Sequence, residues 1–246
     1  MRKYTCHIIA LLFVVAFACK KEDPVRQPLI TPPVEPPAQP PYFDTGNYTA
    51  HEIEGFKQMT VYTTQQIVKW QSPVSVYVAD TSFSYMTKQV DSVIAEMNTL
   101  LDTNLTIRRT FTREGSSIQV YFTDQATYLA LEPIPGTENL RLMGYGYAAW
   151  DSSRNIYYGS IFADTVSTAG DTLLQRFVIQ HEFMHTLGFV GHVTVSTLSS
   201  LMFGYRTMPY LTDYTEYDKK MIRLLYNPAV KAGMNETELN AVIANL

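Results

Sequence analysis

The chain has 246 residues, of which 46% are hydrophobic, so it can bury a substantial core. Its formal net charge of −4 argues against nucleic acid or an anionic surface as the main partner. Only two cysteines are present, Cys6 and Cys19. Because both lie close to the N-terminus, we expect no disulfide framework and no catalytic cysteine in the folded body.

Residues 1–18 have the pattern of a secretory signal peptide. Two basic residues precede the apolar run IIALLFVVAFA, which is short for a membrane span. The following AFAC ends at Cys19 and resembles a bacterial lipobox, although Ala16 stands where Leu is commoner. We therefore expect Cys19 to become lipidated. The protein would then be an outer-membrane lipoprotein exposed at the cell surface, attached to the membrane through Cys19 only. The alternative is a secreted protein cut near Ala18.

A proline-rich segment follows. Residues 24–41 hold eight of the thirteen prolines, a composition typical of an extended tether that packs poorly. Residues 19–41 are thus predicted to be the lipidated cysteine plus its tether. Residues 42–69 carry no clear pattern and leave three alternatives open, namely a linker, a pro-segment or an extra strand of a subdomain.

One folded domain is predicted over residues 70–227. Alternating apolar residues predict strands, and a spacing of three and four residues predicts a helix. The short DSSR segment between two strand patterns predicts a hairpin. In chain order the predictions are a strand at 73–80, a helix at 84–103, a strand at 116–124, a strand at 145–150, the hairpin turn at 151–154 and a strand at 155–164.

The next helix carries the most informative stretch, HEFMHTLGFVGH at residues 181–192. Asp171 is a plausible N-cap, and no proline interrupts the residues that follow. On a helix His181 and His185 lie one turn apart on the same face, so both imidazoles can bind one ion. Zinc accepts imidazole nitrogens, and Glu182 next to them can act as a general base. Gly188 can end the helix.

The motif resembles the signature of the metzincin zinc peptidases, HExxHxxGxxH followed by a Met-turn. The first two histidines, the glutamate and Gly188 match it in register. The signature expects its third histidine at position 191, but Gly191 stands there and His192 follows. We expect His192 to be the third ligand, with one extra residue in the loop. Asp213 and Glu216 are the alternative third ligands.

The segment SSLMFGYRTMP at residues 199–209 resembles the Met-turn. The resemblance implies that Met202 forms an apolar floor beneath the histidines. It also implies a role for Tyr205 at the zinc ion or the oxyanion, although an ordinary loop tyrosine is an equally good interpretation. Met208 is a weaker candidate for the Met-turn methionine. A helix capped by Thr212, Asp213 or Thr215 is predicted to follow.

The resemblance implies an α+β fold, that of a metzincin-like (zincin) catalytic domain at residues 70–227. Its parts would be a mixed twisted sheet, an active-site helix, the Met-turn and a C-terminal helix. An edge strand before the zinc helix, at 145–150 or 155–162, would pair with extended substrate. Residues 228–246 are predicted to form a helical tail with Asn235 as its cap.

The first functional hypothesis is a monomeric zinc endopeptidase that acts on proteins or peptides. The ion would be Zn²⁺, held by His181, His185 and His192, with Glu182 as the general base and Gly188, Met202 and Tyr205 in support. The alternative is a metal-binding surface lipoprotein without catalysis, which binds a peptide or glycoprotein in the same cleft. A structural or adhesive domain with a closed zinc site is a third hypothesis.

Overall fold

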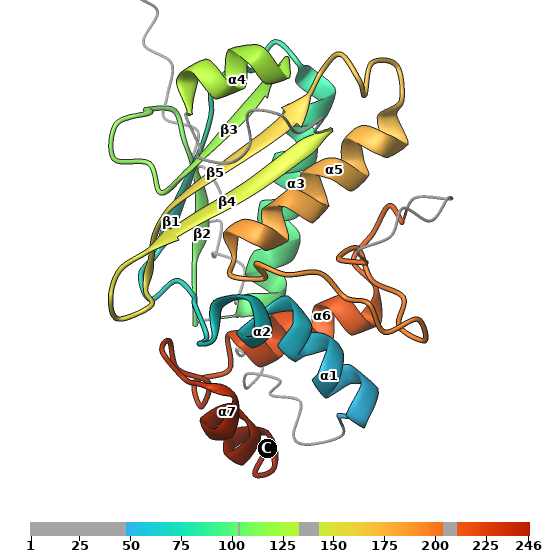
Figure 1. Cartoon of the computed structure of the whole chain (residues 1–246). Coiled ribbons are helices and arrows are strands. Elements are labelled where there is room, and N and C mark those ends of the chain that lie inside the picture. The colour runs from blue at the N-terminus through green and yellow to red at the C-terminus, as the bar shows by residue number, and fades with distance from the viewer. Residues whose placement is uncertain (1–47, 103, 133–142, 204–210) are drawn as a thin grey trace, which may run out of the picture. The chain divides into compact units, whose positions relative to one another are not determined.

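The computed structural model describes residues 48–102, 104–132, 143–203 and 211–246, and these residues form five strands and seven helices (Figure 1). The strands are β1 (Val74–Val78), β2 (Ile107–Thr110), β3 (Ile118–Thr123), β4 (Gly144–Trp150) and β5 (Ile156–Asp164). The helices are α1 (Ala50–Met59), α2 (Val61–Thr64), α3 (Ser84–Leu101), α4 (Gln125–Leu131), α5 (Thr172–Thr186), α6 (Glu216–Leu225) and α7 (Glu236–Ile243). Within the described ranges, no helix has the length and apolar character needed to cross a membrane.

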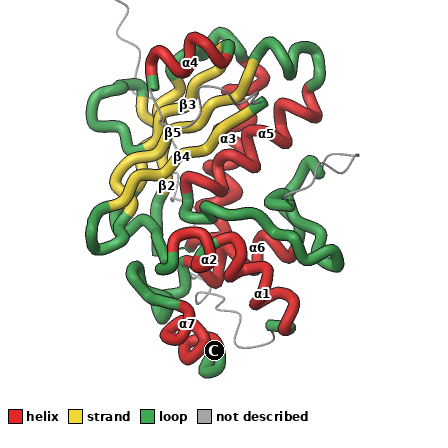
Figure 2. Tube along the Cα trace, viewed as in Figure 1, coloured by secondary structure: helices red, strands yellow, loops and turns green. Residues whose placement is uncertain are grey.

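The strands form one mixed sheet in the order β2-β1-β3-β5-β4, and Figure 2 shows this sheet in yellow. Neighbouring strands are parallel except for β4, which is an edge strand and runs antiparallel to β5. The turn between β4 and β5 is closed by Asp151, whose carboxylate accepts hydrogen bonds from the backbone N–H groups of Ser153 and Asn155. The structure therefore confirms a mixed sheet and the predicted hairpin.

The two faces of the sheet carry cores of different size. The large core lies on the face covered by α3 and α5, and it includes Val120, Ile161 and Phe183. Residues that alternate with these on the strands form a smaller cluster with α4, in which Tyr128 stacks on Phe162 with ring centroids 4.6 Å apart. Because helices cover β5 on both faces, most of its residues are buried, as in strands at the centre of parallel sheets.

The linker and strand alternatives for residues 42–69 are wrong for the part that is described. Residues 50–64 form α1 and α2, and α1 begins with a capping box between Thr49 and Glu52. Phe56, Met59 and Ile67 are fully buried in the same core as the residues of the sheet. Burial of these side chains makes the segment part of the folded body.

The C-terminal predictions are confirmed in outline. The N-cap of α6 is Thr215, one of its three predicted caps, which forms a capping box with Asp218. The N-cap of α7 is Asn235, as predicted, and Glu238 completes its capping box. Leu239 of α7 is fully buried in the large core. The predicted boundaries at residues 70 and 227 therefore do not separate independent cores.

Candidate metal centre

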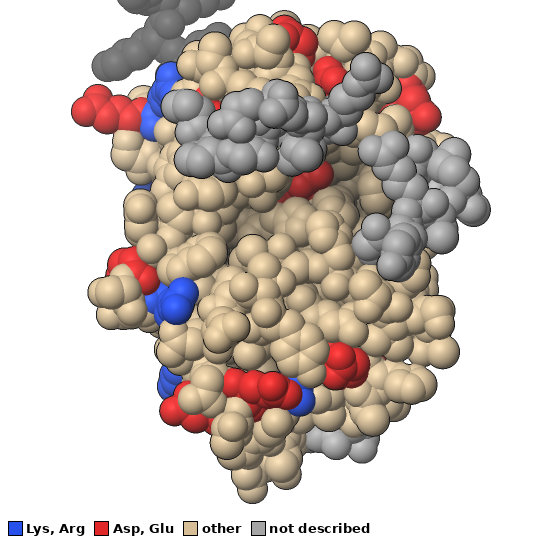
Figure 3. Space-filling view, in the orientation of Figure 1, with Lys and Arg blue, Asp and Glu red and all other residues tan. Residues whose placement is uncertain are grey.

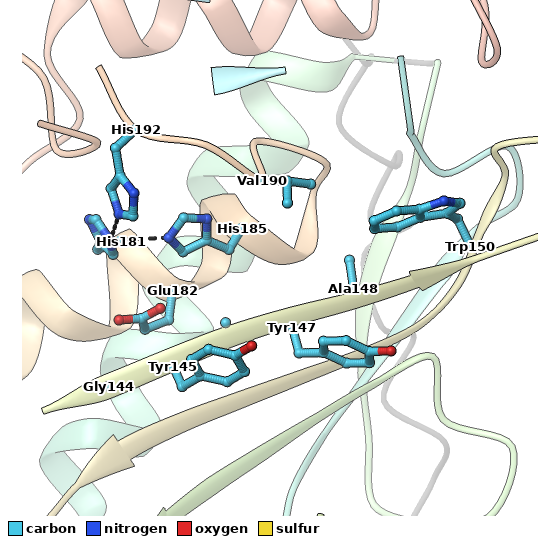
Figure 4. A pocket seen from close by; sticks show the side chains of 11 residues that line it. Gly144, Tyr145, Tyr147, Ala148, Trp150, His181, Glu182, His185, Val190 and His192 are labelled. Carbon is cyan, nitrogen blue, oxygen red and sulfur yellow. Dashed lines mark hydrogen bonds between the residues drawn. The ribbon is translucent and has the colours of Figure 1, made fainter. Parts of the chain in front are cut away.

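Helix α5 places two imidazoles on one face. Its N-cap is Asp171, as predicted, and the Asp171 carboxylate accepts a hydrogen bond of 2.9 Å from the backbone N–H of Leu174. Val178 packs in the core one turn before the histidines. The buried face of α5 thus runs into His181 and His185, which are four residues apart and point to the same side (Figure 4).

The end of α5 is fixed by side chains from distant segments. Trp70 donates its indole N–H to the Thr186 carbonyl at 2.8 Å, and the Tyr226 hydroxyl donates to the Leu187 carbonyl at 2.8 Å. These bonds satisfy carbonyls that a helix end would leave unpaired. Gly188 follows with φ of 111°, which favours glycine, and the chain turns back toward the helix. The predicted helix-ending role of Gly188 agrees with this geometry.

The turn brings His192 to the two helix histidines (Figure 4). The Nε2 atom of His181 lies 3.2 Å from the Nε2 atom of His185 and 3.2 Å from that of His192. All three candidate ligand atoms lie within 4.8 Å of one another. Two nitrogens bound to a tetrahedral zinc at about 2.0–2.1 Å lie roughly 3.3–3.4 Å apart. The spacing of the histidines therefore fits one metal ion.

The tautomers of the two helix histidines also suit a metal ligand. His181 donates from Nδ1 to the Leu201 carbonyl at 2.7 Å, and His185 donates from Nδ1 to the Phe189 carbonyl at 2.6 Å. Each neutral ring then has an unprotonated Nε2. Two such lone pairs 3.2 Å apart repel each other, and a cation between them removes the repulsion. The donor chemistry thus fits a divalent metal.

Burial favours the neutral form of all three histidines. It lowers the pKa of His181 to about 4, partly offset by the hydrogen bond to Leu201. Burial lowers the pKa of His185 well below its ordinary value, and His181 and His192 lower it further. Burial also lowers the pKa of His192. Neutral imidazole is the form that binds metals, so the trio is ready to bind an ion at neutral pH.

Glu182 lies beside the histidines and against strand β4 (Figure 4). Burial raises the pKa of its carboxyl to about 8, and a hydrogen bond from the Gly146 backbone N–H partly offsets this rise. A Cβ atom at Gly146 would lie 2.4 Å from the Glu182 carbonyl oxygen, so glycine is required for this close approach. A bound divalent cation would lower the carboxyl pKa, which favours the ionised form that accepts a proton.

A groove runs between β4 and the histidines, with a cavity volume of about 470 Å³. Figure 3 shows this face hollowed near its middle, with acidic atoms at one edge of the hollow and few other charges around it. Tyr147, Ala148, Trp150 and Val190 give one end of the groove an apolar lining (Figure 4). Among the described residues, the groove is lined by Gly144, Tyr145, Gly146, Tyr147, Ala148, Trp150, His181, Glu182, His185, Val190 and His192.

Hydrogen bonds connect the segment predicted to be a Met-turn to His181 and to the residue after His192. Met202 is fully buried, and its carbonyl accepts a bond of 2.8 Å from the backbone N–H of Val193, the residue after His192. Leu201 supplies the carbonyl that orients His181. The role of Met202 as the floor of the site remains a prediction. Tyr205 and Met208 lie outside the described residues.

Buried Asp218 holds this segment in place. Its carboxylate accepts hydrogen bonds from the Ser200 hydroxyl and from the backbone N–H of Leu201, the latter at 3.1 Å, and also from Thr215. Burial raises the pKa of the Asp218 carboxyl, and these bonds partly offset the rise. Asp218 therefore acts on His181 through Leu201.

Asp218→Ala is expected to lower the free energy of unfolding of the metal-free protein by about 1–3 kcal/mol, because buried donors lose their acceptor. Urea denaturation measures the change. Asp213→Ala is the control, since Asp213 is exposed and its ion pair with Arg176 contributes at most about 1 kcal/mol. Equal losses in the two variants would contradict the role given to Asp218.

The alternative third ligands lie elsewhere. Asp213 pairs with Arg176, and Glu216 pairs with Lys219 on α6 at 3.1 Å. In the described part of the chain, the trio of histidines is the group of side chains gathered closely enough to hold a metal ion. The structure therefore favours His192 over the two carboxylates.

Several residues of the site cannot be recognised from the amino-acid sequence. Leu201 and Phe189 orient the histidines through backbone carbonyls, which have no side-chain signature. The alternation of glycine with tyrosine in GYGY of β4 could have indicated a close backbone approach on one face of the strand.

Comparisons with known proteins add little. No family model and no curated protein matches the chain. Among solved structures, it is similar to a structure of myroilysin with a TM-score of 0.40 and 14% sequence identity, over 66% of this chain and 98% of the other. A likeness of this size assigns neither a family nor an activity, so the site stands on its own geometry.

Proposed function

We propose that this chain is a zinc-dependent endopeptidase. The observation that carries the proposal is the convergence of three imidazole side chains beside one carboxylate. All four groups lie at the wall of an open groove. Three protein ligands leave a fourth position of a tetrahedral ion for water, which is the arrangement of catalytic zinc sites. A structural site would close that position with a fourth side chain.

His181, His185 and His192 would hold the zinc ion. When bound, zinc supplies polarisation of the scissile carbonyl and lowers the pKa of water toward about 7. Glu182 takes the proton of the attacking water at its carboxylate and passes it to the leaving amine. The Gly146 N–H holds this carboxylate toward the groove.

Strand β4 gives the groove a means of binding extended peptides. It is the edge of the sheet, and its residues Gly144–Ala148 line the groove opposite the histidines. No other strand of the described residues pairs with this edge, and an extended substrate can pair with it through backbone hydrogen bonds, which bind peptides with little dependence on sequence. The apolar end formed by Ala148, Trp150 and Val190 would favour substrates with an apolar side chain at that position.

The proposal is tested by proteolysis of an unfolded protein substrate such as reduced, alkylated casein. We expect cleavage by the purified protein, loss of cleavage to background with excess chelator, and recovery on addition of one equivalent of Zn²⁺. Fragments produced equally with and without chelator would rule out a metal-dependent peptidase.

A non-catalytic metal-binding protein is the second candidate. The extra residue before His192 favours it, because the spacing from Gly188 to His192 departs from that of the catalytic signature. In that case zinc binds, and peptides bind in the groove, but the casein substrate stays intact.

The place of action remains the one expected from the sequence. We propose that Cys19 is lipidated and that the body acts on proteins or peptides outside the cell. Residues 1–47 lie outside the described ranges, so this proposal depends on the sequence alone. Metabolic labelling with a fatty acid, compared between the wild type and Cys19→Ser, tests it.

A further inference from the structure

The loop that carries His192 rests on the N-terminal helices rather than on the sheet. The backbone N–H of Gly191 donates to the Met59 carbonyl, the last residue of α1, at 2.8 Å. The ring of Phe189 packs edge-on against Phe56 of α1, with centroids 6.4 Å apart. Segments more than 120 positions apart in the printed sequence therefore meet directly at the third ligand.

Gln58 binds the same loop on the far side of His192. Its side-chain oxygen accepts hydrogen bonds from the backbone N–H of Thr194 at 2.8 Å and from the Thr194 hydroxyl at 3.1 Å. Its amide nitrogen donates to Glu54 one helical turn earlier, at 3.1 Å. Glu54 thus turns the oxygen of Gln58 toward Thr194, and His192 lies between two residues that α1 holds.

The contact also explains why the residue at position 191 is glycine. A Cβ atom there would lie 2.2 Å from the Gln58 carbonyl oxygen and 2.6 Å from the Thr63 hydroxyl. The nearer atom is backbone and cannot move aside without displacing α1. A histidine therefore does not fit at position 191. The ligand side chain is placed instead at the next position, 192.

We propose that α1 and α2 are the positioning element for the third metal ligand, with Gln58 as the positioning residue that fixes the His192 loop. The extra loop residue and the N-terminal helices then act together. The helices occupy the space at position 191, and the longer loop brings the Nε2 atom of His192 to 3.2 Å from that of His181. The inference rests on the proposed metal site, but it needs no peptidase activity.

The test compares zinc affinity in full-length variants, by competition with a chromophoric chelator. Gln58→Ala is expected to weaken zinc binding by about 10-fold, the lower end of the range for losing a group bonded directly to a ligand, because Gln58 holds the loop two residues from His192. Gln66→Ala is the matched control, because Gln66 lies in the same N-terminal segment and makes two hydrogen bonds, to Gly233 and Arg154, away from the loop. Its zinc affinity is expected to stay within about twofold of the wild type.

A rescue variant separates positioning from general stability. The double variant Glu54→Gln, Gln58→Glu exchanges the two groups, so an acceptor still faces Thr194 and a donor–acceptor pair still joins positions 54 and 58. We expect it to recover most of the zinc affinity. Hydrogen exchange at the amides of Gly191 and Thr194 in the metal-free proteins reads the loop directly, with faster exchange expected in Gln58→Ala only.

A second double variant, Gly191→His with His192→Gly, restores the shorter spacing of the metzincin signature. We expect it to lose affinity as His192→Ala does, because α1 excludes the new side chain.

Equal zinc affinities of Gln58→Ala and Gln66→Ala, or tight binding by the double variant, would overturn the proposal. A wild type that binds zinc but cleaves no protein overturns only the peptidase function, whereas a wild type that binds no zinc overturns both.

Discussion

Replacing Glu182 with glutamine is expected to lower kcat/KM for peptide hydrolysis by about 10²–10⁴-fold, the range that a general base contributes. Glutamine keeps the size of the side chain and can still accept the hydrogen bond from Gly146, but it cannot take a proton from water. Glu182 does not belong to the group of three histidines that would hold the metal ion, so zinc affinity should change little. The measurement is steady-state hydrolysis of a fluorogenic peptide, with zinc content determined on the same samples.

The matched control is Glu216→Gln, the same change at an exposed residue of α6. It should keep wild-type turnover and wild-type zinc affinity, and it also tests the alternative in which Glu216 is the third ligand. Full turnover by Glu182→Gln would remove the general base from the mechanism. Loss of zinc from Glu182→Gln would instead assign Glu182 a role in metal binding.

The elements predicted from the sequence are those whose pattern is set by local burial. Helix α5 and strand β5 bury most of their residues, so each contains a largely apolar stretch that can be recognised in the sequence. Strand β2 was not predicted, because it is a four-residue edge strand with the sequence IRRT and one buried side chain. Edge strands of this kind carry polar residues and lack the alternation that identifies a strand.

Helix α1 was not predicted for a different reason. Gly55 lies in the middle of α1, where glycine is unfavourable by about 1 kcal/mol relative to alanine. Its position is explained only by distant residues, since a Cβ atom there would lie 2.4 Å from the Tyr217 hydroxyl and 2.7 Å from Leu198. Tertiary packing selects glycine here against helix propensity, and no local pattern reveals such a choice.

The candidate site likewise combines residues that a local pattern can pair with residues that only the fold brings together. The spacing of His181 and His185 follows from helical geometry, so one stretch of sequence was enough to pair them. The approach of His192 depends on a turn at Gly188 and on α1, which are set by contacts across the fold. A signature with fixed spacing puts its third histidine at position 191, whereas the structure gathers His192 with His181 and His185.

Removing His192 is the second large effect expected. His192→Ala leaves two imidazoles, and zinc affinity should fall by more than the ~100-fold that loss of an outer partner can cost, because a direct ligand is lost. The purified variant should then carry well below one zinc per chain after dialysis, and peptide hydrolysis should fall to background. Metal analysis and chelator competition on the same preparation give both quantities.

His51→Ala is the matched control, since His51 is exposed on α1 and its ring contacts Thr197 rather than the cluster. A carboxylate could replace the lost imidazole only by leaving its present partner, and Asp213 would have to break its pair with Arg176. The double variant His192→Ala, Asp213→Asn decides this point. If His192→Ala binds zinc as the wild type does and only the double variant loses it, Asp213 is the third ligand. The loop held by α1 would then have a purpose other than metal binding.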